Sequence, residues 1–154
     1  MPVMGFTKFE RFFRTAGEVS VDRDDVRRYL DFVNDAIYDM LLLAQATAKA
    51  NARDVILPWD LPITAGVQER MRRFAKMDED IELEPILEEV AARPPLDLAL
   101  ADDTAARLPA LFGGISTALA EIFKIVDSGL KEVHTSEWER VPHRQGPHLI
   151  KLLA

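Results

Sequence analysis

Apolar side chains recur every three or four residues from Arg23 to about Ala52, which predicts one long amphipathic helix. This stretch contains no Gly or Pro, and at the usual rise it would be about 45 Å long. Small domains seldom hold a helix of that length. Asp22 is a suitable N-cap, and acidic residues follow it in the first turn, where the helix dipole favours negative charge. The apolar stripe consists of Val26, Tyr29, Leu30, Val33, Ile37, Met40, Leu41, Ala44 and Ala48.

Two shorter amphipathic segments flank the long one, at residues 6–16 and 63–77. Short extended straps are predicted between them, at residues 18–21 and 55–57, and two prolines after the second strap exclude a helix there. A short helix, a strap, a long helix, a strap and a short helix cannot bury their own apolar faces. A second set of helices must therefore complete the core.

The second half of the chain loosely repeats this order. A short helix around residues 83–90 is followed by a strap at 96–100 and by a long helix that Asp102 or Asp103 can cap and that runs to about residue 127. Pro109 predicts a kink or a late start of that helix. After residue 129 we expect a further strap, a weak helix around Trp138 and a last apolar segment.

Gly113 and Gly114 lie in the middle of the second long helix and leave two interpretations open. Each glycine costs a helix roughly 1 kcal/mol relative to Ala, so the pair could break the helix. Alternatively, the absence of a Cβ lets two helices cross closely. In either case we expect an all-α fold of two units, residues 1–77 and 78–154, that together form one compact domain.

The spacing of four residues around the second strap resembles that of archaeal histones. Those proteins place an Arg at the end of the long middle helix, a β-branched residue three positions later and an Asp seven positions later, which here are Arg53, Ile56 and Asp60, followed by apolar Leu61. A charge-assisted pair between Arg53 and Asp60 would act as a structural clamp on the loop. Residues 11–17 also resemble the end of the first histone helix.

The whole chain further resembles a bacterial family of single-chain double histone folds of unknown function. The landmarks are residues 51–54, 60–63, 77–78 and 94–98. The resemblance implies an intramolecular handshake, or pseudodimer, in which two long helices cross antiparallel and short helices pack outside. It implies no activity.

Composition is that of a globular protein, with 48% apolar and 29% charged residues. No apolar run approaches the ~18 residues of a membrane span, and no secretory apolar region opens the chain. The absence of cysteine excludes disulfides and thiolate sites. We expect a cytoplasmic protein, with the nucleoid as the alternative location.

Charge weighs against DNA binding. Of 19 basic and 26 acidic residues, residues 1–77 hold 12 and 11, whereas residues 78–154 hold 7 and 15. An acidic half repels phosphate backbones. One paired-strap surface would offer Arg53, Asp54, Asp97 and Asp102. The candidate nucleic-acid contacts are Lys8, Arg11, Arg14 and Lys131.

A basic cluster on the third predicted helix is best explained as a solvated face balanced by the acidic residues 78–80. The same helix and the tail provide the candidate interaction surface, through which a dimer is possible although a monomer is expected. Its residues are Arg70, Met71, Arg73, Phe74 and Leu149.

No motif indicates catalysis, a cofactor or a metal. His134, His143 and His148 lie close together in sequence but lack a helical metal-binding spacing, and are expected at the surface. Trp59 and Trp138 are expected to be packing anchors. We therefore expect a non-enzymatic protein-interaction or scaffold module with an unknown protein partner; the alternative is a histone-like, nucleoid-associated DNA-binding protein.

Overall fold

The computed structural model describes residues 11–12, 23–77 and 79–126. Of the expected first short helix only residues 11–12 are described, and they are helical. The expected first strap, and everything expected after residue 126, lie outside the described residues. The described part is all-α apart from two strands of two residues each. In chain order its elements are α2 (Arg23–Ala50), β1 (Val55–Ile56), the 3-10 helix η1 (Pro58–Asp60), α3 (Ala65–Ala75), α4 (Leu83–Ala91), β2 (Ala99–Leu100) and α5 (Asp102–Val126).

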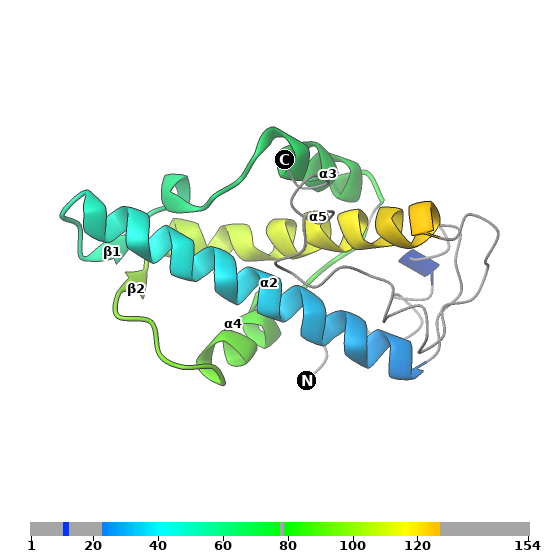
Figure 1. Cartoon of the computed structure of the whole chain (residues 1–154), viewed down its shortest axis with the longest axis horizontal. Coiled ribbons are helices and arrows are strands. Elements are labelled where there is room, and N and C mark those ends of the chain that lie inside the picture. Colours follow the sequence, from blue (N-terminus) through cyan, green and yellow to red (C-terminus); the bar gives the residue numbers. More distant parts are fainter. Residues whose placement is uncertain (1–10, 13–22, 78, 127–154) are drawn as a thin grey trace.

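The two long helices, α2 and α5, run in opposite directions and cross (Figure 1). Helix α3 lies on one side of the crossing and α4 on the other. The C-terminal end of α2 and the N-terminal end of α5 therefore come together, and β1 and β2 lie there. This is the antiparallel crossing of long helices that the sequence resemblance implies.

Helix α2 ends two residues earlier than expected, at Ala50. The cause is Ala52, which has a left-handed backbone with a φ of 56°. The Arg53 amide donates back to the Ala48 carbonyl at 2.9 Å, which closes the helix end and satisfies one of its last carbonyls. This turn sets the direction in which Arg53 leaves the helix.

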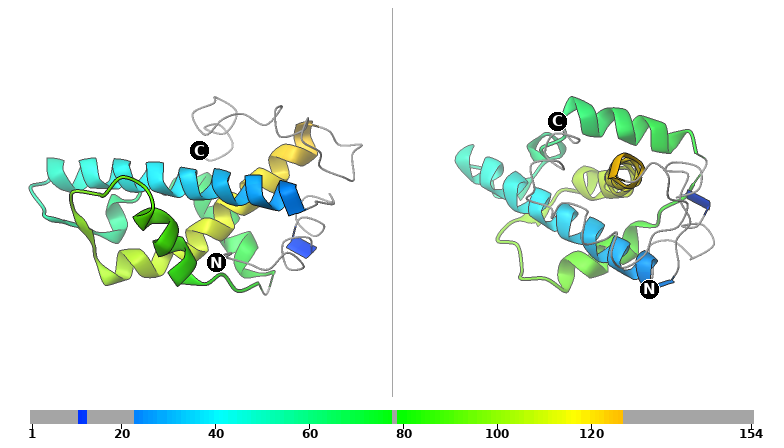
Figure 2. Two further views of the ribbon diagram at one scale, coloured as in Figure 1. Left: turned by 90° about the horizontal axis from the view of Figure 1, so that it is seen from below. Right: turned by 45° about the vertical axis from the view of Figure 1, so that its right-hand side comes forward.

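The middle of α5 is the centre of the core. Every residue from 111 to 120 is buried, so this helix has no solvent face over almost three turns. The right-hand view of Figure 2 shows α5 nearly end-on, with α2, α3 and α4 arranged around it. Its two hydroxyl residues there, Ser116 and Thr117, donate to carbonyls four residues earlier, as buried polar groups must.

The glycine pair permits a close helix crossing and does not break α5. A Cβ at Gly113 would lie within 2.5 Å of three ring carbons of Phe74, and one at Gly114 would lie 2.6 Å from Met71 Cγ. Both contacts come from α3, which makes its most extensive packing with α5. Helix α5 also begins ahead of Pro109 and continues through it, so the late start is wrong.

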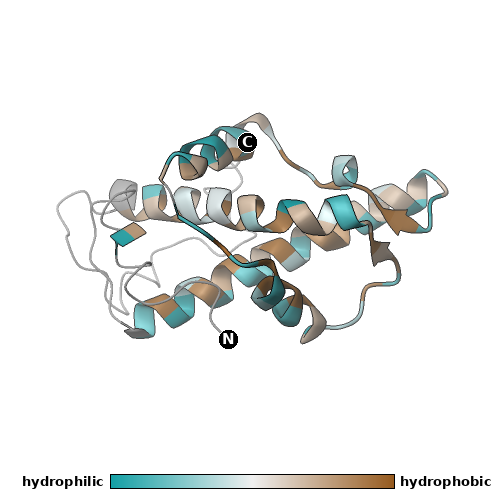
Figure 3. Ribbon diagram, turned by 180° about the vertical axis from the view of Figure 1, so that it is seen from behind, coloured by the Kyte–Doolittle hydropathy of each residue, from teal (hydrophilic) through white to brown (hydrophobic). Residues whose placement is uncertain are grey.

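The straps after α2 and before α5 pair side by side as parallel strands, in the register Val55 to Ala99 and Ile56 to Leu100. The Ile56 carbonyl also accepts hydrogen bonds from the Ala101 amide at 3.0 Å and from Thr104 Oγ1 at 2.7 Å. Both strands are apolar, as their colour in Figure 3 shows. Hydrogen bonds thus join the strap of the first half to the strap of the second half.

Within the described residues, no helix is both long enough and apolar enough to cross a membrane.

We predict that Gly113→Ala destabilises the protein by about 1–2 kcal/mol. In an open helix this change would stabilise by ~1 kcal/mol. Here the new methyl group meets the buried ring of Phe74, which is itself held edge-on against Phe12 with ring centroids 5.8 Å apart. The overpacking penalty, roughly 1–3 kcal/mol, should therefore exceed the helical gain. Urea unfolding followed by circular dichroism measures the change.

The double variant Gly113→Ala with Phe74→Leu is the control. A smaller side chain at position 74 leaves room for the methyl group, so the two changes should cost less together than the sum of their separate costs. A stabilised Gly113→Ala variant would show that α3 does not press on this glycine.

Candidate functional site

Arg53 and Asp60 form a bidentate pair across the loop between α2 and η1. Arg53 Nη1 donates to Asp60 Oδ2, and Nη2 donates to Oδ1, both at 2.6 Å. The Leu57 amide also donates to Asp60 Oδ2 at 2.8 Å. The Asp60 side chain is 0% exposed and that of Arg53 is 24% exposed. The pair therefore fixes β1 and η1 against the end of α2.

The electrostatics of this clamp favour the charged forms of both groups. The hydrogen bonds from Arg53 hold the pKa of Asp60 below its usual value, against the opposing effect of burial and with help from the Leu57 amide. The pKa of Arg53 is raised, chiefly by its hydrogen bond to Asp60. Asp60 is thus an ionised carboxylate, and both of its oxygens accept hydrogen bonds.

The strap before β2 is fastened to α2 by polar side chains. Gln45 Oε1 accepts hydrogen bonds from the Asp97 amide at 2.7 Å and the Leu98 amide at 3.1 Å. The Tyr38 hydroxyl donates to the Pro94 carbonyl at 2.7 Å. Arg93 donates to Asp35 Oδ1 at 2.9 Å, which ties the end of α4 to α2. Hydrogen bonds therefore hold residues 93–98 along α2.

This strap end is acidic. Lys49 and Arg53 are paired with Asp97 and Asp60, and further aspartates are exposed around them. The basic side chains here are Lys49, Arg53 and Arg107, and the acidic ones are Asp54, Asp60, Asp97, Asp102 and Asp103. The paired cations are already neutralised, so this surface offers little positive charge to a phosphate backbone.

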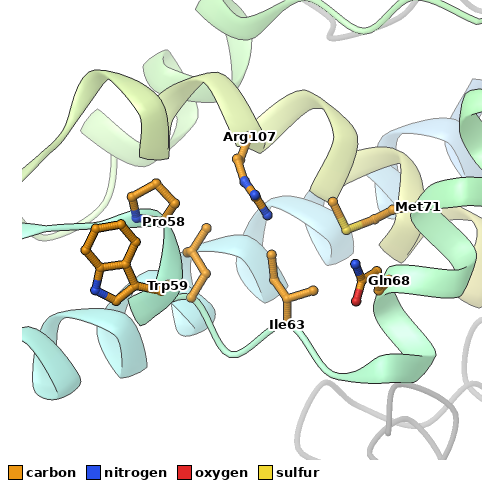
Figure 4. Close-up of a pocket in the computed structure, with 7 residues that line it drawn as sticks. Pro58, Trp59, Ile63, Gln68, Met71 and Arg107 are labelled. Carbon is orange, nitrogen blue, oxygen red and sulfur yellow. The ribbon is translucent and has the colours of Figure 1, made fainter.

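A hollow of about 250 Å³ lies beside the clamp, between η1, α3 and α5 (Figure 4). Trp59 stands at its edge and is 73% exposed, so the expectation that it is a packing anchor is wrong. Neighbouring Asp60 points inward to the clamp, and the indole is left outside. The hollow is lined by Pro58, Trp59, Leu61, Ile63, Gln68, Met71 and Arg107.

Arg11 is the described member of the candidate nucleic-acid contacts, and it is engaged with a carboxylate. Its Nε and Nη2 both lie 2.7 Å from Glu79 Oε1. Lys8, Arg14 and Lys131 lie outside the described residues. Among the described residues, the structure therefore places Arg11 alone of these candidates, and it places Arg11 against a carboxylate.

The candidate interaction surface on α3 is largely committed to α5. Phe74 is 6% exposed and packs on Gly113, so its placement on an exposed surface is wrong. Met71 is partly buried against Gly114. Leu149 lies outside the described residues. The close approach of α3 to the glycine pair explains why these apolar residues are covered.

The basic residues of α3 have a different partner from the expected one. Arg70 Nε donates to Glu121 Oε2 at 3.0 Å, and Arg73 Nη1 donates to Glu121 Oε1 at 2.5 Å. Arg72 pairs with Glu69, three residues earlier on the same helix. Glu121 is 51 and 48 residues away in sequence from Arg70 and Arg73, so only the crossing of α3 and α5 reveals it as the partner.

Sequence reasoning also missed Arg107 and the hollow beside it. Arg107 lies one turn after Asp103 on α5 and looks like an ordinary exposed helix residue. Only the folding of the first half over α5 places it beside Trp59 and Ile63. The available signal was Trp59 itself, a large aromatic residue in a turn between two prolines.

Comparison with known proteins places this architecture among bacterial relatives. A family model described as a domain of unknown function (DUF1931) matches residues 9–143. A crystal structure from Thermus thermophilus is 42% identical, covers 90% of this chain and 94% of its own, and has a TM-score of 0.86. A crystal structure from Aquifex aeolicus is 25% identical, covers 91% of this chain and 92% of its own, and has a TM-score of 0.75. A protein of Aquifex aeolicus (strain VF5), described as uncharacterized, is 28% identical over 120 residues, which is 78% of this chain and 70% of the relative.

We predict that Asp60→Asn lowers Tm by roughly 3 °C or more at pH 7, and that this deficit shrinks in acid. Asp60 has a lower pKa in the folded chain than in the unfolded chain, where it is near 4. Its contribution to stability is therefore complete above that unfolded value and is lost as the pH falls through the folded pKa. Thermal unfolding of both proteins between about pH 6 and pH 2 measures the difference.

Asp97→Asn is the control, because Asp97 is an exposed carboxylate paired with Lys49 and should contribute little. A wild-type advantage over Asp60→Asn that stays constant down to the lowest pH would show that the charge of Asp60 does not carry the clamp.

Proposed function

We propose that this chain, which belongs to the DUF1931 family, is a pair of histone folds joined in one polypeptide and acts as a non-enzymatic protein-interaction module. In this proposal the chain keeps the histone architecture as its core but does not wrap DNA. The surfaces of the straps and of η1 meet a protein partner.

The element order after the start of α2 supports the histone-fold part of the proposal. A long helix, a strap and a short helix (α2, β1 and α3) are followed by a short helix, a strap and a long helix (α4, β2 and α5). Straps that pair side by side where two long helices cross are typical of histone pairs, and β1 and β2 pair in this way. The Arg53–Asp60 clamp has the spacing of the archaeal histone pair.

Contacts between the halves support a pseudodimer that works as a monomer. Helix α3 of residues 1–77 packs on α5 of residues 78–154, and the strap pair joins the same two parts. Because both halves are present in one chain, the effective concentration of each for the other is high. No second copy is needed to complete this core.

The charge of the strap end carries the argument against DNA wrapping. Histones place unpaired basic side chains on paired straps, against phosphates and in the minor groove. Here Lys49 and Arg53 are bound to carboxylates, and Asp54, Asp97 and Asp102 face solvent. Affinity for a DNA duplex rises with the number of phosphates that basic side chains neutralise, so a surface whose cations are already paired should bind a duplex weakly.

The exposed indole of Trp59 favours a protein partner at the same end. A tryptophan that is 73% exposed leaves a large apolar area in water, and Trp and Arg are the residues that most often dominate protein interfaces. Trp59 and Arg107 line one hollow. A partner that covers them would bury apolar area and could pair with the cation.

We predict that the full chain does not retard a DNA duplex of about 30 base pairs in a mobility-shift titration at ~50 mM salt and protein up to ~10 µM. Low salt favours any electrostatic contact, so a negative result there is the strongest one. A retarded band whose affinity falls steeply with salt would instead support the histone-like, nucleoid-associated function.

The triple variant Asp54→Asn, Asp97→Asn, Asp102→Asn serves as the matched control. It removes three of the four exposed negative charges of the strap end, keeps Asp103, and leaves the Arg53–Asp60 clamp intact. If this charge excludes DNA, the variant should bind the duplex measurably at low salt, with a salt-dependent affinity.

A further inference from the structure

We propose that the hollow between η1, α3 and α5 docks a short segment of a partner protein that presents an apolar side chain next to a carboxylate. The inference rests on the proposed protein-interaction function and assigns it a site and a ligand chemistry. Trp59 and Ile63 would contact the apolar side chain, and Arg107 would pair with the carboxylate.

The walls of the hollow are held in place before any ligand arrives. Pro58 and Trp59 belong to η1, which the buried Arg53–Asp60 clamp fixes. Gln68 and Met71 belong to α3, which is pressed onto the glycine pair of α5. A preformed surface loses little conformational entropy on binding, which favours affinity for a short segment.

Five of the seven lining residues are apolar, although polar atoms expose somewhat more surface in the hollow than apolar atoms do. One of the five apolar residues, Trp59, is poorly covered by the chain itself. Pro58, Leu61, Ile63 and Met71 line the hollow. Figure 4 shows the indole of Trp59 next to Pro58 at one end of it. An aliphatic side chain placed against the indole would remove apolar area of both partners from water, at about 25 cal/mol per Å². This is the usual arrangement of an interface anchor.

Arg107 gives the hollow its charge preference. Its side chain reaches from α5 toward Ile63, and within the described part of the chain it makes no ion pair. Asp103, one turn earlier on the same helix, is the nearest acid in sequence, and no ion pair joins the two. A guanidinium offers a planar fork that matches a carboxylate with two parallel hydrogen bonds. The arginines of the clamp and of α3 are, by contrast, already bound to carboxylates; these are Arg53, Arg70, Arg72 and Arg73.

Size favours a peptide over a cofactor. The hollow measures about 250 Å³, below the ~300–1,000 Å³ of sites that enclose small molecules. It is also open along the exposed Trp59 edge, so a chain can enter and leave it. Gln68, at the α3 end, supplies an amide donor and acceptor suited to peptide backbone groups.

The test is an NMR titration of the ¹⁵N-labelled full chain with a capped six-residue peptide in which leucine precedes glutamate. The signal of the Trp59 indole N–H, assigned with Trp59→Phe, reports occupancy of the hollow. We expect it to shift with millimolar affinity. The same peptide with glutamine in place of glutamate should bind roughly 3- to 10-fold more weakly.

Arg107→Gln should remove the difference between the two peptides and leave the fold unchanged, because Arg107 is exposed. Arg28→Gln, an exposed arginine on α2 outside the hollow, and Leu43→Ala, an exposed apolar residue on the same helix, are the matched controls and should bind like the wild type.

Equal binding of the two peptides, or an unmoved Trp59 signal, overturns the assignment of this hollow. Shifts confined to other residues also overturn it but leave the protein-interaction function standing. That function fails separately, if the wild-type chain binds duplex DNA in the mobility-shift titration.

Discussion

The fold depends on the close packing of α3 against the glycine pair of α5. Gly113 and Gly114 let Phe74 and Met71 approach the α5 backbone, and this contact joins residues from the first half of the chain to the centre of the second. Helix α5 is buried on all sides over residues 111–120, so it cannot fold without the helices around it. Hydrophobic burial between the two halves is therefore a condition of the fold. The hydrogen bonds and ion pairs at the strap end fix how the two halves are oriented.

That constraint also determines which surfaces are available for function. Because α3 covers α5, its buried Phe74 is not free to bind a partner, and two of its arginines are paired with Glu121. The strap end remains, where the Arg53–Asp60 clamp draws Asp60 inward and leaves Trp59 outside. One structural pair thus explains both how β1 and η1 are fixed at this end and why its indole is exposed.

Periodicity alone predicts the long helices and the straps of the described residues well, since these follow from local spacing. The caps of the long helices are predicted less well, because Asp22 lies outside the described residues and Asp102 and Asp103 lie inside the first turn of α5, not before it. Side-chain partners that lie far apart in the sequence could not be predicted from local spacing. The Arg53–Asp60 pair could be proposed because both residues lie in one loop, whereas Glu121 and Gln45 find their partners in distant parts of the sequence. The glycine pair allowed two interpretations, and only the position of Phe74 decides between them. The hollow at Arg107 depends on three elements and has no local signature.

The most direct test of this account is to prepare residues 1–77 and residues 78–154 as separate polypeptides and record circular dichroism and NMR spectra of each, alone and mixed. The account predicts that each fragment alone lacks a cooperative thermal transition and dispersed signals, and that an equimolar mixture gains both. A fragment that folds cooperatively without the other would contradict it.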